Sequence, residues 1–233
     1  MKGKLYLIPS PLGDNEPSEV IPQSTLDVAC SLNIFVVEET RTARRFLSRA
    51  GLRGHIEELE FHELNEHTRP EEVDAFASLF EKGDVGLISE AGLPAVADPG
   101  ALLVALCHRR GIEVVPLVGP SSLMLALMAS GLNGQSFAFR GYLPAKTDER
   151  KTALKEVERI SRQLGQSQII IETPYRNDSM FADMLKTLSG TTRLCIAADI
   201  TLPTQLIRTM SLEQWGRHPI QIGKRPCVFI ILA

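Results

Sequence analysis

Residues 86–100 read GLISEAGLPAVADPG, an apolar run that gives way to a loop with two prolines and two further glycines. The apolar run predicts the end of a buried β-strand, and an apolar helical pattern resumes after Gly100. Glu90 and Asp98 are the only charged residues of the loop. Because proline fixes φ and glycine lets the backbone approach a neighbour closely, this loop is stiff and suited to holding a ligand.

Strand-type and helix-type segments alternate on both sides of this loop. Strands are expected at residues 4–8, 34–39, 84–89 and 112–118, with a further strand leading into residues 61–67, and amphipathic helices at 70–82 and 100–110. Repeated strand, helix, strand order predicts right-handed crossovers and a largely parallel sheet that helices cover on both faces.

A second series of elements follows residue 119. Strands are expected at 136–142, 167–172, 193–198 and 227–232, and helices at 121–130, 147–163 and 176–188. A chain of 233 residues is long enough for one large domain or two small ones. The two series predict two α/β domains with largely parallel sheets, residues 1–118 and 119–233.

Composition excludes several classes of protein. With 25 Lys and Arg against 28 Asp and Glu, the net charge is −3, so an anionic partner has to be bound by a local basic patch. No segment reaches the ~18 apolar residues of a membrane span, and we expect no membrane partner and a cytoplasmic location. The widely spaced cysteines are typical of buried reduced thiols, so no metal is expected; they are Cys30, Cys107, Cys195 and Cys227.

Several familiar catalytic motifs are incomplete. The segment HELNEH at 62–67 has Glu66 where a zinc-binding H-E-x-x-H motif needs its second histidine. The segment GPSSL at 119–123 lacks the closing glycine of a nucleophile elbow. Neither a phosphate-binding G-x-x-x-x-G-K-[ST] loop nor a G-x-G-x-x-G loop is present. The sequence therefore does not favour these hydrolases, NTPases or dinucleotide-binding proteins.

Five strand-end loops have unusual compositions instead. They are PSPLGD at 9–14, EETRTARR at 38–45, FHELNEH at 61–67, SEAGLPAVADPG at 89–100 and VGPSS at 118–122. In a parallel α/β sheet, ligands bind outside the carboxyl ends of the strands. The five loops are therefore expected to converge on one ligand-binding crevice.

Two of these features have a structural interpretation beside the functional one. Ser121 or Ser122 either caps a buried helix or offers the positive end of that helix to a polar ligand. Four arginines after the second strand form either a phosphate-binding patch or an ordinary solvated helix face; they are Arg41, Arg44, Arg45 and Arg49. Taken alone, each feature favours the structural interpretation.

Together, the loops resemble the tetrapyrrole methylase-like superfamily of S-adenosylmethionine-dependent methyltransferases. They are most similar to the branch that methylates a ribose 2′-hydroxyl of small-subunit ribosomal RNA. That branch has T-P-I-G-N, E-D-T-R, H-N-E, S-D-A-G-T-P-x-x-x-D-P-G, P-G-P-[SC]-A and F-x-G-F-L-P-x-K motifs. This chain has, in the same order, PSPLGD, EETR, LNEH, SEAGLPAVADPG, VGPSS and FAFRGYLPAK, followed by IETPYR at 171–176. The matches span roughly three-quarters of the chain.

The resemblance implies a fold, a cofactor and partners. It implies two α/β domains with S-adenosylmethionine in the cleft between them, methyl transfer to ribosomal RNA or the small ribosomal subunit, and a homodimer. The cofactor residues that it implies are Ala91, Gly92, Leu93, Pro94, Val96, Ser121, Ser122, Glu172, Thr173, Ile200, Pro226 and Cys227.

The resemblance also suggests residues for catalysis. Glu39 is the first candidate for the base, Arg41 for holding a phosphate, and Asn65 and Glu66 for a place near the acceptor. Glu39 and Glu90 each replace an aspartate of the branch, and residues 199–207, DITLPTQLI, replace an R-E-[LI]-T-K-x-x-E run. Two rival functions are a tetrapyrrole C-methyltransferase, which usually has a G-x-G-x-G first loop, and an S-adenosylmethionine-binding protein without turnover.

Overall fold

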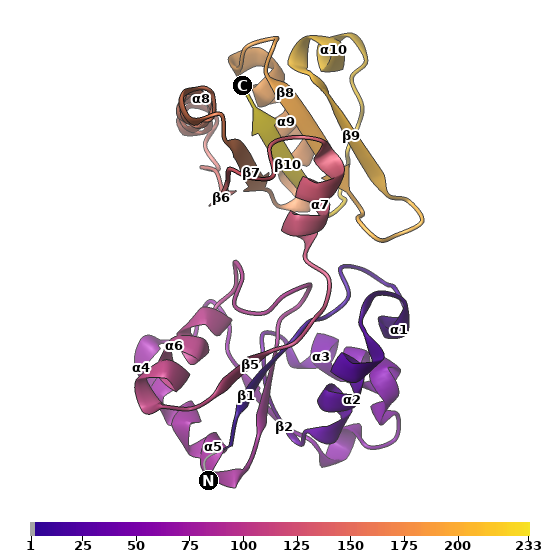
Figure 1. The fold of residues 1–233 in the computed structure, drawn as a ribbon, viewed down its shortest axis with the longest axis vertical. Coiled ribbons are helices and arrows are strands. Elements are labelled where there is room, and N and C mark those ends of the chain that lie inside the picture. The colour runs from indigo at the N-terminus through magenta and orange to yellow at the C-terminus, as the bar shows by residue number, and fades with distance from the viewer. Residues whose placement is uncertain (1–2) are drawn as a thin grey trace. The chain divides into compact units, whose positions relative to one another are not determined.

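The computed structural model describes residues 3–233, which separate into two compact units, Met1–Ser121 and Ser122–Ala233. Each unit contains one five-stranded sheet flanked by helices (Figure 1). The expected α/β class with two sheets is confirmed. The domain division after residue 118 stays a prediction.

Unit 1 is built on a parallel sheet with strand order β3-β2-β4-β1-β5. Its strands are β1 (Leu5–Ile8), β2 (Ile34–Val37), β3 (Glu60–Glu63), β4 (Val85–Ile88) and β5 (Val114–Pro116). All four pairings are parallel. The expected parallel sheet is therefore confirmed for this unit.

Helices cover both faces of this sheet. The helical segments are α1 (Pro17–Val20), α2 (Gln23–Ser31), α3 (Thr40–Leu47), a π-helical turn (Ser48–Leu52), a 3₁₀ turn (Ile56–Glu58), α4 (Pro70–Val73), a 3₁₀ turn (Asp74–Ser78), α5 (Leu79–Lys82) and α6 (Gly100–Arg110). Successive residues of β2 enter opposite cores, Val36 on one side and Phe35 and Val37 on the other. Gly86 on β4 faces the core that contains Phe35, where a Cβ would come within 2.7 Å of Ile8 Cδ1.

Unit 2 has a mixed sheet with strand order β6-β7-β10-β8-β9. Its strands are β6 (Phe137–Tyr142), β7 (Ser167–Ile171), β8 (Arg193–Ala198), β9 (Leu206–Ser211) and β10 (Cys227–Leu232). Only β6 and β7 pair in parallel among the described strands of this sheet, and the other three pairings are antiparallel. The expectation of a largely parallel sheet is wrong for this unit.

The difference arises from strand β9, which the sequence analysis does not predict. A turn at residues 199–205 folds β9 back onto β8 as a hairpin, and hairpins impose antiparallel pairing. The turn contains Asp199 and Thr201 at positive φ, 51° and 75°, instead of the glycine or Asn-Gly pair that marks most tight hairpins. Its sequence therefore carries no strong turn signal.

The helices of unit 2 are α7 (Ser122–Ser130), α8 (Thr147–Leu164), a 3₁₀ turn (Pro174–Arg176), α9 (Asn177–Thr187) and α10 (Leu212–Arg217). α8, α9 and α10 pack on one sheet face around Phe229 and Trp215. α7 packs against the opposite face, where Thr209 Oγ1 donates to the Ser130 carbonyl at 2.7 Å.

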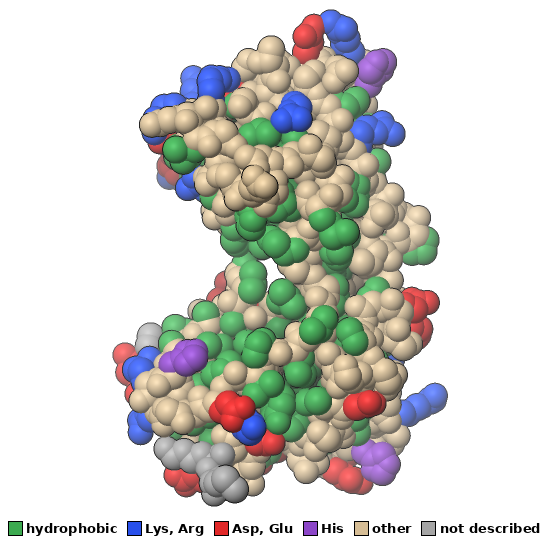
Figure 2. All heavy atoms as spheres, in the orientation of Figure 1, with side chains coloured by type: hydrophobic (Ala, Val, Ile, Leu, Met, Phe, Trp, Pro, Cys, Tyr) green, Lys and Arg blue, Asp and Glu red, His purple; other side chains and the backbone are tan. Residues whose placement is uncertain are grey.

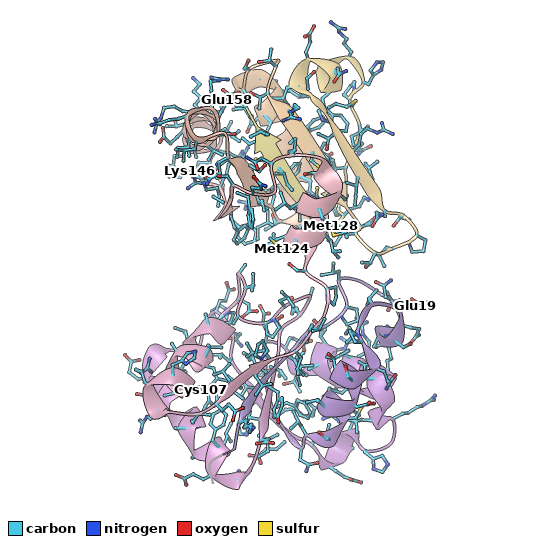
Figure 3. The ribbon with its side chains drawn as sticks, viewed as in Figure 1. Glu19, Cys107, Met124, Met128, Lys146 and Glu158 are labelled. Atoms are coloured by element: carbon cyan, nitrogen blue, oxygen red, sulfur yellow. The ribbon has the colours of Figure 1, made fainter. Side chains whose placement is uncertain are left out.

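The charged residues of α8 fall into two groups. Lys and Arg side chains gather over the surface of this helix (Figure 2), but Arg150 is buried and donates to Asp183 at 2.5 and 2.8 Å. Glu158, labelled in Figure 3, accepts from the backbone N–H of Ser189 at 2.8 Å. These buried pairs fasten α8 to the rest of unit 2, so Arg150, unlike the other basic side chains of this helix, does not face solvent.

The cysteines behave as the sequence predicts. Cys107, labelled on α6 in Figure 3, is buried with Cys195 and Cys227, and Cys30 is half-buried. Burial raises the pKa of the Cys107 thiol to about 11 and that of Cys227 to about 12. In residues 3–233, no cluster of His, Cys, Asp and Glu is arranged to hold a metal ion. Across the same residues, every helix falls short of the length and apolar content that spanning a bilayer requires.

We expect Cys30 to react with thiol reagents before the other three cysteines. At pH 8 the buried thiols of Cys107 and Cys227 are protonated and shielded, and the thiolate is the reactive form. Timed alkylation followed by peptide mass spectrometry measures this order. Equal labelling of all four cysteines in the native protein would contradict it, and labelling in denaturant is the control.

Candidate functional site

The carboxyl ends of β2, β4 and β1 are neighbours, so the loops that follow these strands lie together. Ser10, after β1, and Gly92, after β4, exchange two backbone hydrogen bonds of 2.9 and 3.1 Å. The hydroxyl of Ser10 also donates to the Ser89 carbonyl at 3.1 Å. Hydrogen bonds therefore hold the loop after β1 against the loop after β4.

The loop between β4 and α6 is held in an unusual backbone conformation. Gly92, Ala95 and Ala97 have φ values of +77°, +65° and +62°. The Asp98 carboxylate accepts hydrogen bonds from the backbone N–H groups of Ala95 at 2.9 Å and Gly100 at 2.7 Å. Asp98 thus supports the turn from within, and burial raises the pKa of its carboxyl group.

Gly92 brings this loop beside the end of unit 1. A Cβ at Gly92 would lie 3.1 Å from Leu12 Cδ2 and 3.4 Å from the Pro120 carbonyl oxygen. The cofactor residues expected at 91–94 therefore lie close to the segment that leads into Ser121. Val96, on the same loop, exposes 44% of its surface. Leu93 and Pro94 lie in the loop between Gly92 and Val96.

Glu39, the expected base, caps helix α3. Its carboxylate accepts from the backbone N–H groups of Arg41 at 2.8 Å and Thr42 at 2.6 Å, and from the Thr42 hydroxyl at 2.5 Å. The Thr42 hydroxyl and these backbone donors lower the pKa of Glu39. A carboxylate that is stabilised in its charged form is a weaker base, so the geometry favours a positioning role for Glu39.

Replacing Glu39 with alanine is expected to reduce the free energy of unfolding by about 1 kcal/mol at pH 7, the typical contribution of a helix N-cap. Because folding lowers the pKa of Glu39, its contribution is complete above the ordinary value of 4.5 and is lost as pH falls through the lower folded value. Urea unfolding at pH 7 and pH 3 measures both effects. A difference between the variant and wild type that persists undiminished at pH 3 would contradict this interpretation.

Glu38, the residue before this cap, has different surroundings. Its side chain is half-buried, and Oε2 accepts from the backbone N–H of Glu90 at 3.2 Å. Burial raises the pKa of Glu38, and the nearby carboxylates of Asp98, Glu90 and Glu66 raise it further. The sequence analysis passes over Glu38 because two adjacent glutamates look alike in a sequence.

The other residues expected near the acceptor come from the neighbouring strand ends. Asn65 and Glu66 follow β3, which pairs with β2, and the Thr40 hydroxyl at the start of α3 donates to Glu63 at 2.7 Å. The Asn65 side chain accepts from the His67 backbone N–H at 3.0 Å and so shapes its own turn. Glu66 is exposed in this turn, and Arg41 is exposed on α3.

The cofactor residues expected in unit 2 gather at one edge of its sheet. β10 runs antiparallel to β7 and β8, so its first residue lies beside the last residues of both strands. This edge carries Glu172, Thr173, Ile200, Pro226 and Cys227, whereas Ser122 begins α7. The side chains of Ile200 and Cys227 are buried, which leaves mainly their backbone atoms available to a ligand.

Glu172 combines burial with an unused acceptor. Its Oε1 accepts from the Thr173 backbone N–H at 2.6 Å and from Arg176 Nε at 2.9 Å. Its Oε2 is buried and has no hydrogen-bond partner among residues 3–233. A buried acceptor without a partner is costly, so this oxygen is suited to a ligand hydroxyl or amino group.

Residues 4–215 match the family model described as Tetrapyrrole (Corrin/Porphyrin) Methylases. The chain belongs to this family. The match covers nearly all of unit 1 and most of unit 2, including every predicted site residue except Pro226 and Cys227.

Two curated relatives of this tetrapyrrole methylase are named Ribosomal RNA small subunit methyltransferase I. The protein from Vibrio cholerae is 34% identical over 211 residues, 90% of this chain and 69% of the relative. The protein from Pseudomonas aeruginosa is 33% identical over 233 residues, 98% of this chain and 78% of the relative.

A solved structure of a uroporphyrin-III C-methyltransferase from Thermus thermophilus, complexed with S-adenyl homocysteine, has the same fold. It superposes with a TM-score of 0.59 at 16% identity and covers 99% of this chain and 97% of that chain. Family membership and these relatives confirm the expected enzyme class, an S-adenosylmethionine-dependent methyltransferase.

Residues of each unit have the chemistry that this cofactor needs. In unit 1, the stiff 91–96 loop has backbone polar groups and the half-exposed apolar side chain of Val96. In unit 2, Glu172 has an unused buried oxygen that is suited to a polar group.

Proposed function

We propose that this tetrapyrrole methylase transfers a methyl group to a ribose 2′-hydroxyl of small-subunit ribosomal RNA. The observation that carries the proposal is the 34% identity to a Ribosomal RNA small subunit methyltransferase I over 90% of this chain. The arginine-rich start of α3, beside the strand-end loops, supports an RNA acceptor because guanidinium groups bind phosphate well.

S-adenosylmethionine would supply the methyl group, and its sulfonium sulfur would leave as the acceptor oxygen bonds to the methyl carbon. The protein's task is then to align the reactants and exclude water. We propose that residues 91–96 and Ser121 bind the cofactor from unit 1. In unit 2 we assign the same role to Ser122, Glu172, Thr173, Ile200, Pro226 and Cys227.

Glu38 is the residue that we propose removes the proton from the ribose hydroxyl. Its raised pKa lies nearer the working pH than that of an ordinary carboxyl group, which makes it a better base. Glu39 then acts by capping α3 and fixing the backbone of Arg41. Arg41 holds a phosphate, and Asn65 and Glu66 border the acceptor.

Two other functions make different predictions. A tetrapyrrole C-methyltransferase usually has a G-x-G-x-G loop after the first strand, and this chain has PSPLGD there. A protein that binds cofactor without turnover is suggested by the altered 199–207 stretch. In the structure this stretch forms an ordered turn, in which Asp199 accepts from Arg225 Nε at 2.6 Å and Thr204 Oγ1 at 2.8 Å.

The test combines binding and transfer. Calorimetry measures S-adenosylmethionine affinity, and tritiated S-adenosylmethionine is then incubated with small ribosomal subunits that lack their methyl groups or with a reduced uroporphyrin. Label in the ribosomal RNA supports the proposal. Label in the porphyrin favours the first alternative, and binding without transfer to either acceptor favours the second.

We also propose that the enzyme is a homodimer that acts in the cytoplasm. Met124 and Met128, labelled on α7 in Figure 3, expose 42% and 78% of their surfaces one helical turn apart. Exposed apolar ridges of this kind favour association. Light scattering that gives the mass of a dimer would support the proposal, and a monomer at high concentration would contradict it.

A further inference from the structure

Two of the four arginines in residues 41–49, which form α3 and the start of the π-helical turn after it, are already paired. Arg44 pairs with Glu57, and its guanidinium lies 5.8 Å from the centroid of the Phe61 ring. Arg49 pairs with Asp14 at 2.7 Å and with Glu16 at 3.0 Å. These two side chains fasten α3 and the π-helical turn after it to neighbouring segments of unit 1, so the structural interpretation accounts for them.

Arg41 and Arg45 differ from this pair. Both are exposed, and within residues 3–233 neither side chain forms an ion pair within 4 Å. Residues four apart lie on the same side of a helix, so the two guanidinium groups project from one face of α3. Two acidic groups beside α3 are occupied, since Glu39 caps the helix and Glu57 pairs with Arg44.

The two arginines border a surface hollow, which Glu39 and Thr42 also line. Thr42 and Arg45 also line a second, adjoining pocket of about 50 Å³. This second pocket lies between the loop after β1 and the end of β4. These are the segments that the hydrogen bonds of Ser10 and Gly92 hold together. Arg45 therefore connects the basic face of α3 to the strand-end loops.

The second pocket is too small for a nucleoside, because most of its lining is buried, including Ser10, Phe46 and Ile88. Glu90 also lines this pocket, and its carboxylate repels phosphate. A phosphate is therefore favoured at the surface hollow that Arg41 and Arg45 border.

We propose that Arg41 and Arg45 bind backbone phosphates of an RNA strand. The inference rests on the proposed function and extends it to Arg45, which with Arg41 positions the strand for methyl transfer. Guanidinium groups bind phosphate through two parallel hydrogen bonds, and contacts of this kind fix the register of a nucleic acid on a protein. With a net charge of −3, the attraction has to be local to this face.

The test compares Arg41→Ala, Arg45→Ala and the double variant with wild type and with Arg110→Ala. Arg110 is an exposed arginine without an ion pair among residues 3–233, and it ends α6, which leads back to the amino end of β5. The probes are a fluorescent single-stranded RNA oligonucleotide and unmethylated small ribosomal subunits. Affinity is measured over a series of salt concentrations, with S-adenosylmethionine affinity as a folding control.

We expect each single variant at α3 to lower the slope of log affinity against log salt by about 0.7, the value for one phosphate contact to a single strand. Arg110→Ala should keep the wild-type slope, and all variants should bind S-adenosylmethionine like wild type. Unchanged RNA affinity and slope in the double variant would overturn the inference, as would a wild-type protein that binds neither RNA. If the Arg41 and Arg45 variants reduce the salt slope but wild type transfers no methyl group to RNA, the phosphate contacts would be supported and the proposed function contradicted.

Discussion

Replacing Glu38 with glutamine is expected to reduce the rate constant of methyl transfer by at least about 100-fold, the lower end of what a general base contributes. Glutamine keeps the size of the side chain and an oxygen that can accept the hydrogen bond from the Glu90 backbone N–H. The substitution removes the basic carboxylate and little else. Single-turnover transfer of labelled methyl groups to unmethylated small ribosomal subunits measures the rate.

The pH dependence adds a second signature of Glu38. A base works only when ionised, so the wild-type rate should rise as pH increases through the folded pKa of Glu38, which lies above that of an ordinary glutamate. In Glu38→Gln this rise should disappear. Glu39→Gln is the matched control, and it should lose less activity and keep the rise. A Glu38→Gln enzyme with wild-type rate would rule out this assignment, and loss confined to Glu39→Gln would return the role to Glu39.

Replacing Gly92 with valine is expected to weaken S-adenosylmethionine binding by at least about tenfold, or 1.4 kcal/mol. Gly92 has φ +77°, and the left-handed region costs a residue with a Cβ roughly 1–2 kcal/mol. A Cβ there would also approach Leu12 Cδ2 to 3.1 Å, and valine adds two further methyl groups. Both effects move the loop of residues 91–96 away from its position beside Ser10.

Gly111→Val separates strain from position. Gly111 follows α6 in unit 1 as its C-cap with φ +65°, and a Cβ there would have no neighbour within 4 Å. Both variants should lose unfolding free energy, measured in urea, but only Gly92→Val should lose cofactor affinity, measured by calorimetry. Equal affinities in the two variants would show that the 91–96 loop does not bind the cofactor.

Much of unit 1 follows from its sequence because local signals and packing agree there. Strands such as β2 are buried on both faces, so their runs of apolar residues mark a parallel sheet. The stiff loop at 89–100 marks a strand end. Asp98 supports the turn of this loop by accepting two backbone hydrogen bonds. Unit 2 is less readable, because β9 follows a turn that lacks glycine.

The candidate site is predictable in outline and not in the roles of single residues. A sequence shows two glutamates before α3, but only the fold shows that Glu39 caps the helix and that Glu38 is half-buried beside Glu90. It also shows four arginines without showing which of them have partners. Pairings such as that of Arg49 with Asp14 join residues 35 positions apart, which no local pattern reveals.

The most direct test of the central claim is the chemical position of the transferred methyl group. Small ribosomal subunits are incubated with the enzyme and S-adenosylmethionine that carries a deuterated methyl group, and their RNA is digested to nucleosides for mass spectrometry. We predict that the label lies on the ribose fragment of one nucleotide and is absent when Glu38→Gln replaces wild type. Label on a base, or no label in RNA at all from an enzyme that binds S-adenosylmethionine, would contradict the account.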